Sequence, residues 1–234
     1  MDINLRGELW DNDSADILRY WGWRDITAPM DIAAALEQAN GEDVTILINS
    51  PGGDMTVGAE IRSMFRRYKG KTTALFQGYG ASAATLAASG CTEITSEPGA
   101  LLCYHNPVSG AHGDYQDMAH ASESLRNARD CILEMYAARK SSKSREELIA
   151  LMDKNIYISP SQALEYGLLD KIIPLNGAAE EDPAAFVAAA GSRMRITTAM
   201  REKYQAHVAA QREAQANEDK ARRALAHLKA LATY

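Results

Sequence analysis

FQGYGASAATLAA, residues 76–88, places a single serine between a glycine-rich turn and an alanine-rich helix. The preceding residues 72–76 predict a strand, and Gly78 and Gly80 allow the chain to turn sharply through positive φ angles. Ser82 therefore stands at the start of a helix, where the first backbone N–H groups have no partner within the helix. Such groups can stabilise a developing oxyanion, so this junction favours Ser82 as a nucleophile.

The local sequence also allows two other interpretations of this stretch. Serine is among the commonest helix N-caps, so Ser82 can simply cap the helix. Residues 78–83 also fit the G-x-G-x-x-A pattern of dinucleotide-binding turns. That pattern normally opens the first βαβ unit and is followed about twenty residues later by an acidic residue. Here a complete βα unit comes first, and Glu93 and Glu97 arrive too early.

A second turn, at residues 49–54, can supply backbone donors to the same site. Residues 44–48 predict a buried strand, and the proline and two glycines that follow let the backbone lie close to a ligand. The N–H groups of Gly53 and Ala83 can then converge on one oxygen, as acyl transfer requires. A plain strand-to-helix turn would have the same sequence and no function.

A third feature is a histidine that closes an apolar strand at residues 100–104. Imidazole titrates near neutral pH, so His105 suits a general base for a serine, although a strand-end histidine can equally be structural. No acid or cysteine lies at metal-ligand spacing from the other four histidines, His112, His120, His207 and His227. We therefore expect no metal site and no cofactor.

Four blocks together resemble one known family. Residues 48–53, 78–84, 104–107 and 158–170 occur in the order and at the intervals of the ClpP peptidase family, and the likeness extends from about residue 3 to 173. Four matching blocks argue against dinucleotide binding. The resemblance implies an α/β fold, the ββα spiral shared with crotonases, with a protruding handle helix. It also implies a Ser-His-Asp site that cleaves peptide bonds inside a chamber of stacked rings.

The resemblance also implies roles for individual residues. Ser82 becomes the nucleophile, His105 the base, and the two backbone donors named above form the oxyanion hole. The aspartate position of the family falls on Asn155, whose amide oxygen can orient an imidazole but contributes no charge. Reduced activity is therefore expected. Asp153 is the alternative third member, if the loop carries it inward.

The same resemblance predicts the domain organisation. A peptidase domain is expected at residues 1–175, with a handle at about 110–150 that contains an amphipathic helix over 114–141. Residues 176–234 are expected to form a linker and an alanine-rich helical tail. From Ser192 onward the chain has nine Lys or Arg and four Asp or Glu, a charge of +5 against −11 for the rest. A helix with so few large apolar side chains must pack on the body, pair with copies or fray.

Composition and the N-terminus set the expected partners and compartment. Residues 3–9 already predict the first strand, so little chain is left to line a pore and an unfoldase ATPase is not expected to be required. Short chains of this kind resemble phage prohead proteases. We therefore expect a polypeptide substrate, a homo-oligomeric ring, and capsid or scaffold proteins as partners. The net charge of −6 argues against nucleic-acid binding. No signal peptide or membrane-spanning run is present, which indicates the cytoplasm, or the prohead if a phage encodes the chain.

The sequence is also compatible with two other classes of function. A crotonase-like acyl-CoA enzyme would share the spiral and the oxyanion-binding turns without needing Ser82 and His105 as a pair. A catalytically weak assembly or scaffold protein would keep the fold and use its basic tail. A fluorophosphonate separates these classes, because only an activated serine reacts with it.

Overall fold

The computed structural model describes residues 1–139, 143–174 and 196–231. The chain forms two compact units. Unit 1 comprises Met1–Ala15 and Arg24–Ala188, and unit 2 comprises Asp16–Trp23 and Ala189–Tyr234. The expected boundary at 175–176 and the expected linker lie outside the described residues.

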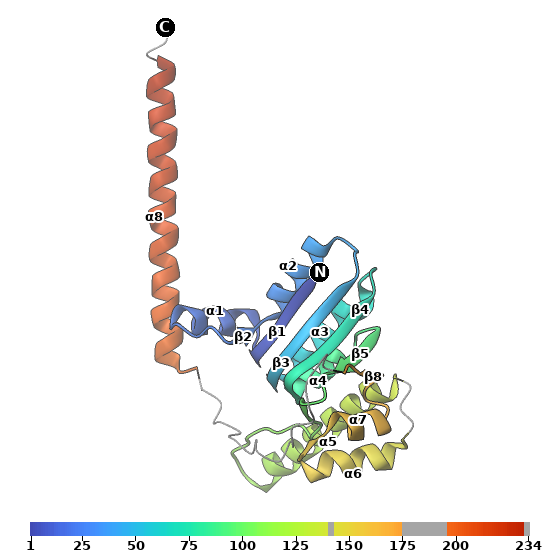
Figure 1. The fold of residues 1–234 in the computed structure, drawn as a ribbon. Helices are drawn as coiled ribbons and strands as arrows, with labels where there is room; N and C mark the ends of the chain where they lie inside the picture. Colours follow the sequence, from blue (N-terminus) through green and yellow to red (C-terminus); the bar gives the residue numbers. More distant parts are fainter. Residues whose placement is uncertain (140–142, 175–195, 232–234) are drawn as a thin grey trace. The chain divides into compact units, whose positions relative to one another are not determined.

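Unit 1 is built on one mostly parallel sheet of eight strands (Figure 1). Its main path has the order β2-β1-β3-β4-β5-β8, with every neighbouring pair parallel. Off this path, β6 pairs with β4 in parallel and with β7 in antiparallel orientation. The strands are β1 (Asp2–Leu9), β2 (Ile26–Thr27), β3 (Val44–Gly53), β4 (Thr72–Ala81), β5 (Glu93–Ser96), β6 (Leu101–Cys103), β7 (Tyr157–Ile158) and β8 (Lys171–Ile172).

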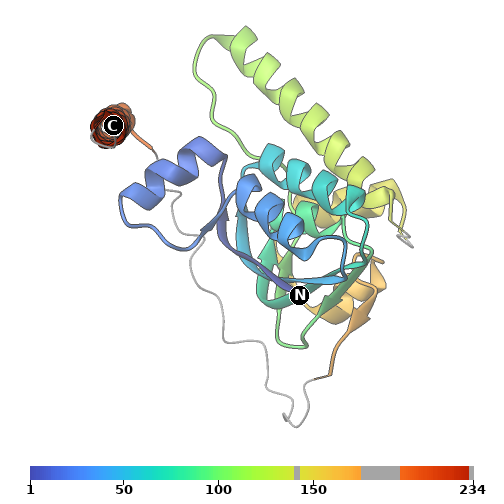
Figure 2. The same ribbon diagram turned by 90° about the horizontal axis from the view of Figure 1, so that it is seen from above.

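Helices connect the strands, because parallel neighbours require crossover connections. In Figure 2, α2 and α3 lie side by side over one face of the sheet, and the longer α5 extends beyond them. The helices are α1 (Asn12–Tyr20), α2 (Pro29–Ala39), α3 (Met55–Arg67), α4 (Ala83–Ala88), α5 (Tyr115–Ala137), α6 (Arg145–Lys154), α7 (Pro160–Glu165) and α8 (Thr198–Leu231). The α/β class predicted from the sequence is confirmed.

The core of unit 1 lies between the sheet and helices that include α2, α3 and α4. Buried residues alternate with half-buried ones along β3, so one side of that strand packs into the core. Ile46, Ile48 and Phe76 are completely buried there. At about 25 cal/mol per Å² of apolar surface removed from water, such side chains supply the main stabilisation of the sheet.

The long helix α5 is packed at one end and exposed at the other. Ile132, Leu133 and Tyr136 are buried, whereas Met118, two turns or more towards the N-terminus, is 40% exposed. The predicted helix is therefore confirmed, but only its C-terminal part contributes to the core of unit 1.

Unit 2 combines the first turns of α8 with residues 16–23. The ring of Tyr20 lies 5.8 Å from that of Tyr204 and 4.6 Å from that of His207, measured between centroids. Lys203 Nζ lies 5.7 Å from the ring centre of Trp21. Aromatic and cation–π contacts of this kind stabilise helix packing. The tail therefore packs, in its first turns, on this N-terminal segment.

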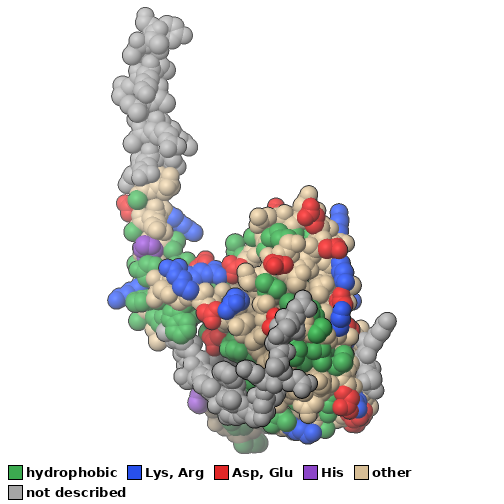
Figure 3. Space-filling view, in the orientation of Figure 1, with side chains coloured by type: hydrophobic (Ala, Val, Ile, Leu, Met, Phe, Trp, Pro, Cys, Tyr) green, Lys and Arg blue, Asp and Glu red, His purple; other side chains and the backbone are tan. Residues whose placement is uncertain are grey.

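Charged side chains of both signs are intermingled on the face of unit 1 presented in Figure 3. Among the described residues, no helix has both the length and the apolar character that crossing a bilayer requires.

Candidate active site

The serine turn is strained at the serine itself. β4 continues to Ala81, and neither Gly78 nor Gly80 is among the glycines with positive φ, so the predicted turn through these glycines is wrong. Both positions require glycine because a side chain there would clash with neighbouring side chains. A Cβ on Gly80 would lie 2.1 Å from the ring of Phe76, and one on Gly78 would lie 2.7 Å from a side-chain oxygen of β3. The positive φ, 55°, belongs to Ser82.

Ser82 is not a capping residue in this structure. It precedes α4, but its side chain makes no capping hydrogen bond. Its backbone is held on both sides, since its N–H donates to the carbonyl of Cys103 at 3.0 Å and its carbonyl accepts from the hydroxyl of Thr85 at 2.6 Å. A non-glycine residue in such a conformation costs about 1–3 kcal/mol and persists only where its surroundings impose it. A strained strand-to-helix turn that presents a serine hydroxyl is typical of nucleophiles.

The second predicted turn lies directly against the serine turn. Gly52 has a φ of 88°, and a Cβ there would lie 2.6 Å from Ser82 Cβ and 2.8 Å from the amide nitrogen of Ala83. Gly53 follows at the end of β3, opposite Leu9 of β1. The structure thus brings together the two segments that carry the predicted oxyanion donors.

Sheet pairing places His105 at the same edge of the sheet as Ser82. Ala81 of β4 pairs with Cys103 of β6, and His105 follows two residues later. Its Nδ1 lies 2.6 Å from the backbone oxygen of Asn106. A carbonyl only accepts, so Nδ1 carries the proton and Nε2 is left as the acceptor that a base requires. Within the described residues no hydrogen bond joins this imidazole to Ser82, a contact that in free enzymes often tightens only when substrate binds.

The candidate third members lie in and just after the last turn of α6, beyond the end of the β6–β7 pairing. β6 and β7 are antiparallel with Cys103 opposite Tyr157, and extending this register by two residues sets Asn155 opposite His105. Asn155 ends α6 in the left-handed conformation, at φ 48° and ψ 47°, and is exposed. Asp153 accepts a hydrogen bond from the Asn106 side chain at 2.7 Å. In the part of the chain that the structure describes, neither candidate is hydrogen-bonded to the imidazole.

Asn106 was not singled out by the sequence, although it follows the histidine directly. Its side-chain nitrogen binds Asp153, and its side-chain oxygen is buried without a hydrogen-bond partner. Its backbone oxygen holds His105. Asn106 therefore links the imidazole to the acid of α6, and its unpaired oxygen offers an acceptor close to the site.

The sequence did not predict a buried pair of hydroxyl groups that contacts the backbone of Ser82. Thr85 Oγ1, which binds the carbonyl of Ser82, lies 2.7 Å from the hydroxyl of Tyr136 in α5. The Tyr136 ring meets that of Tyr104 edge to face at 5.4 Å. Burial raises the pKa of both tyrosines, so their hydroxyls stay neutral. This pair ties the serine turn to the packed end of α5.

The cysteines are poor candidates for chemistry. All three are free, and only Cys131 is exposed. Burial raises the pKa of Cys103 to about 11 and that of Cys91 to about 12, so both remain thiols near neutral pH. Across the described ranges, no three His, Cys, Asp or Glu side chains are grouped as a metal site would need.

Comparison with known proteins identifies the family. The family model for Clp protease matches residues 25–176. The chain is 32% identical over 127 residues to the ATP-dependent Clp protease proteolytic subunit of Nephroselmis olivacea, which covers 53% of this chain and 61% of that protein. It is 31% identical over 140 residues to the subunit of the same name from Mesostigma viride, covering 57% and 61%. The corresponding subunit of Dehalococcoides mccartyi is 28% identical over 134 residues, covering 56% and 66%.

The chain spans less than two thirds of the length of these relatives. The matched region contains the serine turn, the histidine strand and the α6 terminus described above. The family model covers well over half of the chain, and the parallel sheet agrees with it. The resemblance predicted from the four sequence blocks is confirmed, and the chain belongs to the Clp protease family.

Proposed function

We propose that this protein is a serine endopeptidase that hydrolyses polypeptide substrates through Ser82 and His105. Two observations carry the proposal. Ser82 has a strained backbone and a side chain that does not cap α4, and the neighbouring strand ends at a histidine whose Nε2 is available as an acceptor. Membership of the Clp protease family supports it and does not favour the acyl-CoA alternative.

The proposed reaction follows from these positions. His105 Nε2 takes the proton of Ser82 as the serine oxygen attacks the peptide carbonyl. The carbonyl oxygen becomes an oxyanion, to which the N–H groups of Gly53 and Ala83 donate. The imidazolium then gives its proton to the leaving amine, and water hydrolyses the acyl-enzyme by the same two steps.

Asn155 is the proposed orienting residue for the imidazole, with Asp153 as the alternative. The register of β6 and β7 supports Asn155, whereas the hydrogen bond through Asn106 supports Asp153. All of these positions precede residue 175, so we assign the chemistry to a peptidase domain at 1–175 and no chemical role to residues 176–234.

The biological setting is proposed on resemblance alone. We infer a ring of identical subunits that matures capsid or scaffold proteins of a phage in the cytoplasm or prohead. Sedimentation of the full chain tests the ring.

Labelling with a fluorophosphonate tests the peptidase proposal directly, because only an activated serine reacts. We expect stoichiometric labelling of the wild type, none of Ser82→Ala, and strongly slowed labelling of His105→Ala. Ser63→Ala, at an exposed position of α3, is the matched control and should label normally. Labelling of Ser82→Ala at the wild-type rate would overturn the assignment.

A further inference from the structure

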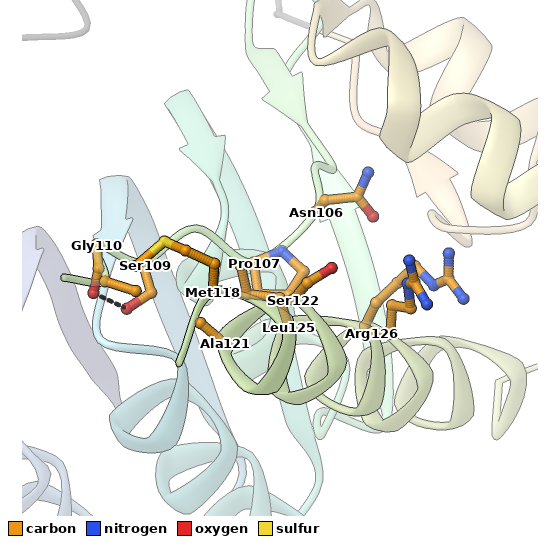
Figure 4. A pocket seen from close by; sticks show the side chains of 11 residues that line it. Asn106, Pro107, Ser109, Gly110, Met118, Ala121, Ser122, Leu125 and Arg126 are labelled. Atoms are coloured by element: carbon orange, nitrogen blue, oxygen red, sulfur yellow. Dashed lines mark hydrogen bonds between the residues drawn. The ribbon is translucent and has the colours of Figure 1, made fainter. Parts of the chain in front are cut away.

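A pocket of about 460 Å³ begins at the residue next to His105. It lies between residues 106–111 and the exposed part of α5 (Figure 4). Pro107, Met118 and Leu125 give it apolar walls. Asn106 both lines the pocket and holds the His105 imidazole through its backbone oxygen, so the pocket adjoins the proposed base.

The pocket is cationic at one end. Its lining includes Arg126 and Arg129 and no acidic residue. In Figure 4, Arg126 and Asn106 lie at one end, and Met118, Ser109 and Gly110 lie at the other. A substrate side chain whose methylene groups contacted the apolar wall would therefore place its terminal group near a guanidinium group.

The carboxylate that pairs with Arg129 lies outside the pocket lining. Arg129 donates twice to one oxygen of Asp130, and Arg145 donates to the same oxygen at 2.8 Å, so two arginines share one carboxylate. No ion pair involves Arg126 within the described residues, where it is exposed. Asp153 binds the Asn106 amide and does not line the pocket. Arg126 and Arg129 thus line this end of the pocket with no carboxylate in the lining.

We propose that the pocket is a subsite for an acidic side chain of the peptide substrate, read by Arg126 and Arg129. A guanidinium matches a carboxylate through paired, charge-assisted hydrogen bonds, and the apolar wall suits the methylene groups of glutamate. The subsite rests on the proposed peptidase function. The side chain that this subsite would bind has a carboxylate at the end of a short chain of methylene groups.

Matched peptides test the subsite. Internally quenched peptides, acetylated and amidated at their ends, carry either Glu or Gln at each position flanking the cleaved bond. At the one position whose side chain enters the pocket, we expect kcat/KM to be about fivefold higher for the Glu peptide than for the Gln peptide. A factor of about five corresponds to the upper range of the free energy contributed by a partly exposed ion pair. The preference should fall towards one in the Arg126→Gln, Arg129→Gln double variant, and at 0.5 M salt through screening. Arg66→Gln removes an equal charge from α3, outside the pocket, and should keep the preference.

Equal rates for every Glu and Gln pair in the wild type would overturn the proposal. A preference that survives the double variant would do so as well. A second source of a carboxylate is the peptide C-terminus, so the Gln peptide is also measured as its free acid. A gain for the free acid with no gain for Glu would likewise overturn an acidic side-chain subsite.

Binding separates this proposal from the peptidase assignment. Fluorescence anisotropy of the same peptides on Ser82→Ala reports affinity without turnover. We expect the Glu peptide to bind about fivefold more tightly, with the same dependence on the two arginines. Equal binding would refute the subsite even if the wild type hydrolyses peptides. A retained Glu preference in a protein that neither labels nor hydrolyses would refute the peptidase function and leave the subsite supported.

Discussion

Replacing Gly52 by alanine should displace the nucleophile Ser82 without replacing any catalytic residue. The new Cβ would lie 2.5 Å from the carbonyl oxygen of Ala81 and 2.6 Å from Ser82 Cβ, in a backbone with φ of 88°. Restoring ordinary contact at 3.4 Å requires a movement of about 0.9 Å between the two turns. A displacement of about 1 Å at a reacting group costs about 100-fold in rate.

The same substitution should lower stability. The unfavourable φ costs about 1–3 kcal/mol, and overpacking costs about 1–3 kcal/mol more. We take about 4 kcal/mol in total, which lowers Tm by about 8–16 °C for a domain of this size. Circular dichroism measures Tm, and the rate of fluorophosphonate labelling reports the nucleophile.

Gly99→Ala is the matched control. A Cβ there would have no heavy atom within 4 Å, and its φ is not in the left-handed range. We expect wild-type labelling and an unchanged Tm. If Gly52→Ala also melted and labelled like the wild type, the close approach of the β3 turn to Ser82 would be refuted.

Three further predictions concern neighbouring residues. Thr85→Val leaves the Tyr136 hydroxyl buried without a partner, so the free energy of unfolding should fall by about 1–3 kcal/mol and labelling should slow, with Thr85→Ser restoring both; an unaltered labelling rate would disprove the positioning role. At pH 8, iodoacetamide should alkylate exposed Cys131 and spare Cys103, whose raised pKa of about 11 keeps it protonated; mass spectrometry of the folded protein checks this, and rapid modification of Cys103 would contradict it. Asn155→Asp should raise peptide turnover by stabilising the imidazolium, by less than the roughly 10⁴ that separates the two residues in chymotrypsin-type enzymes; unchanged turnover would favour the alternative acid.

Local sequence was sufficient for the elements and for the family. Apolar residues predicted the strand that begins at Val44, and the helix after the turn at residues 49–54 begins at Met55 because Asp54 caps it. Apolar periodicity predicted α5. These features depend on residues a few positions apart, which is why pattern and capping preferences suffice for them.

Only the tertiary structure decided the details of the site. Gly80 is required because a Cβ there would meet the Phe76 ring, and the positive φ belongs to Ser82, so predicting φ from residue type alone failed. The link from Asp153 to Asn106 joins side chains 47 positions apart, and the Thr85–Tyr136 pair joins side chains 51 apart.

Such contacts are fixed by strand order, register and side-chain rotamers, none of which is encoded within a short window of sequence. The sequence by itself therefore determined the family and limited the candidates for the chemistry to a few residues. The folded sheet decided which of them meet, because the partners of Ser82 and His105 come from strands and helices far along the chain.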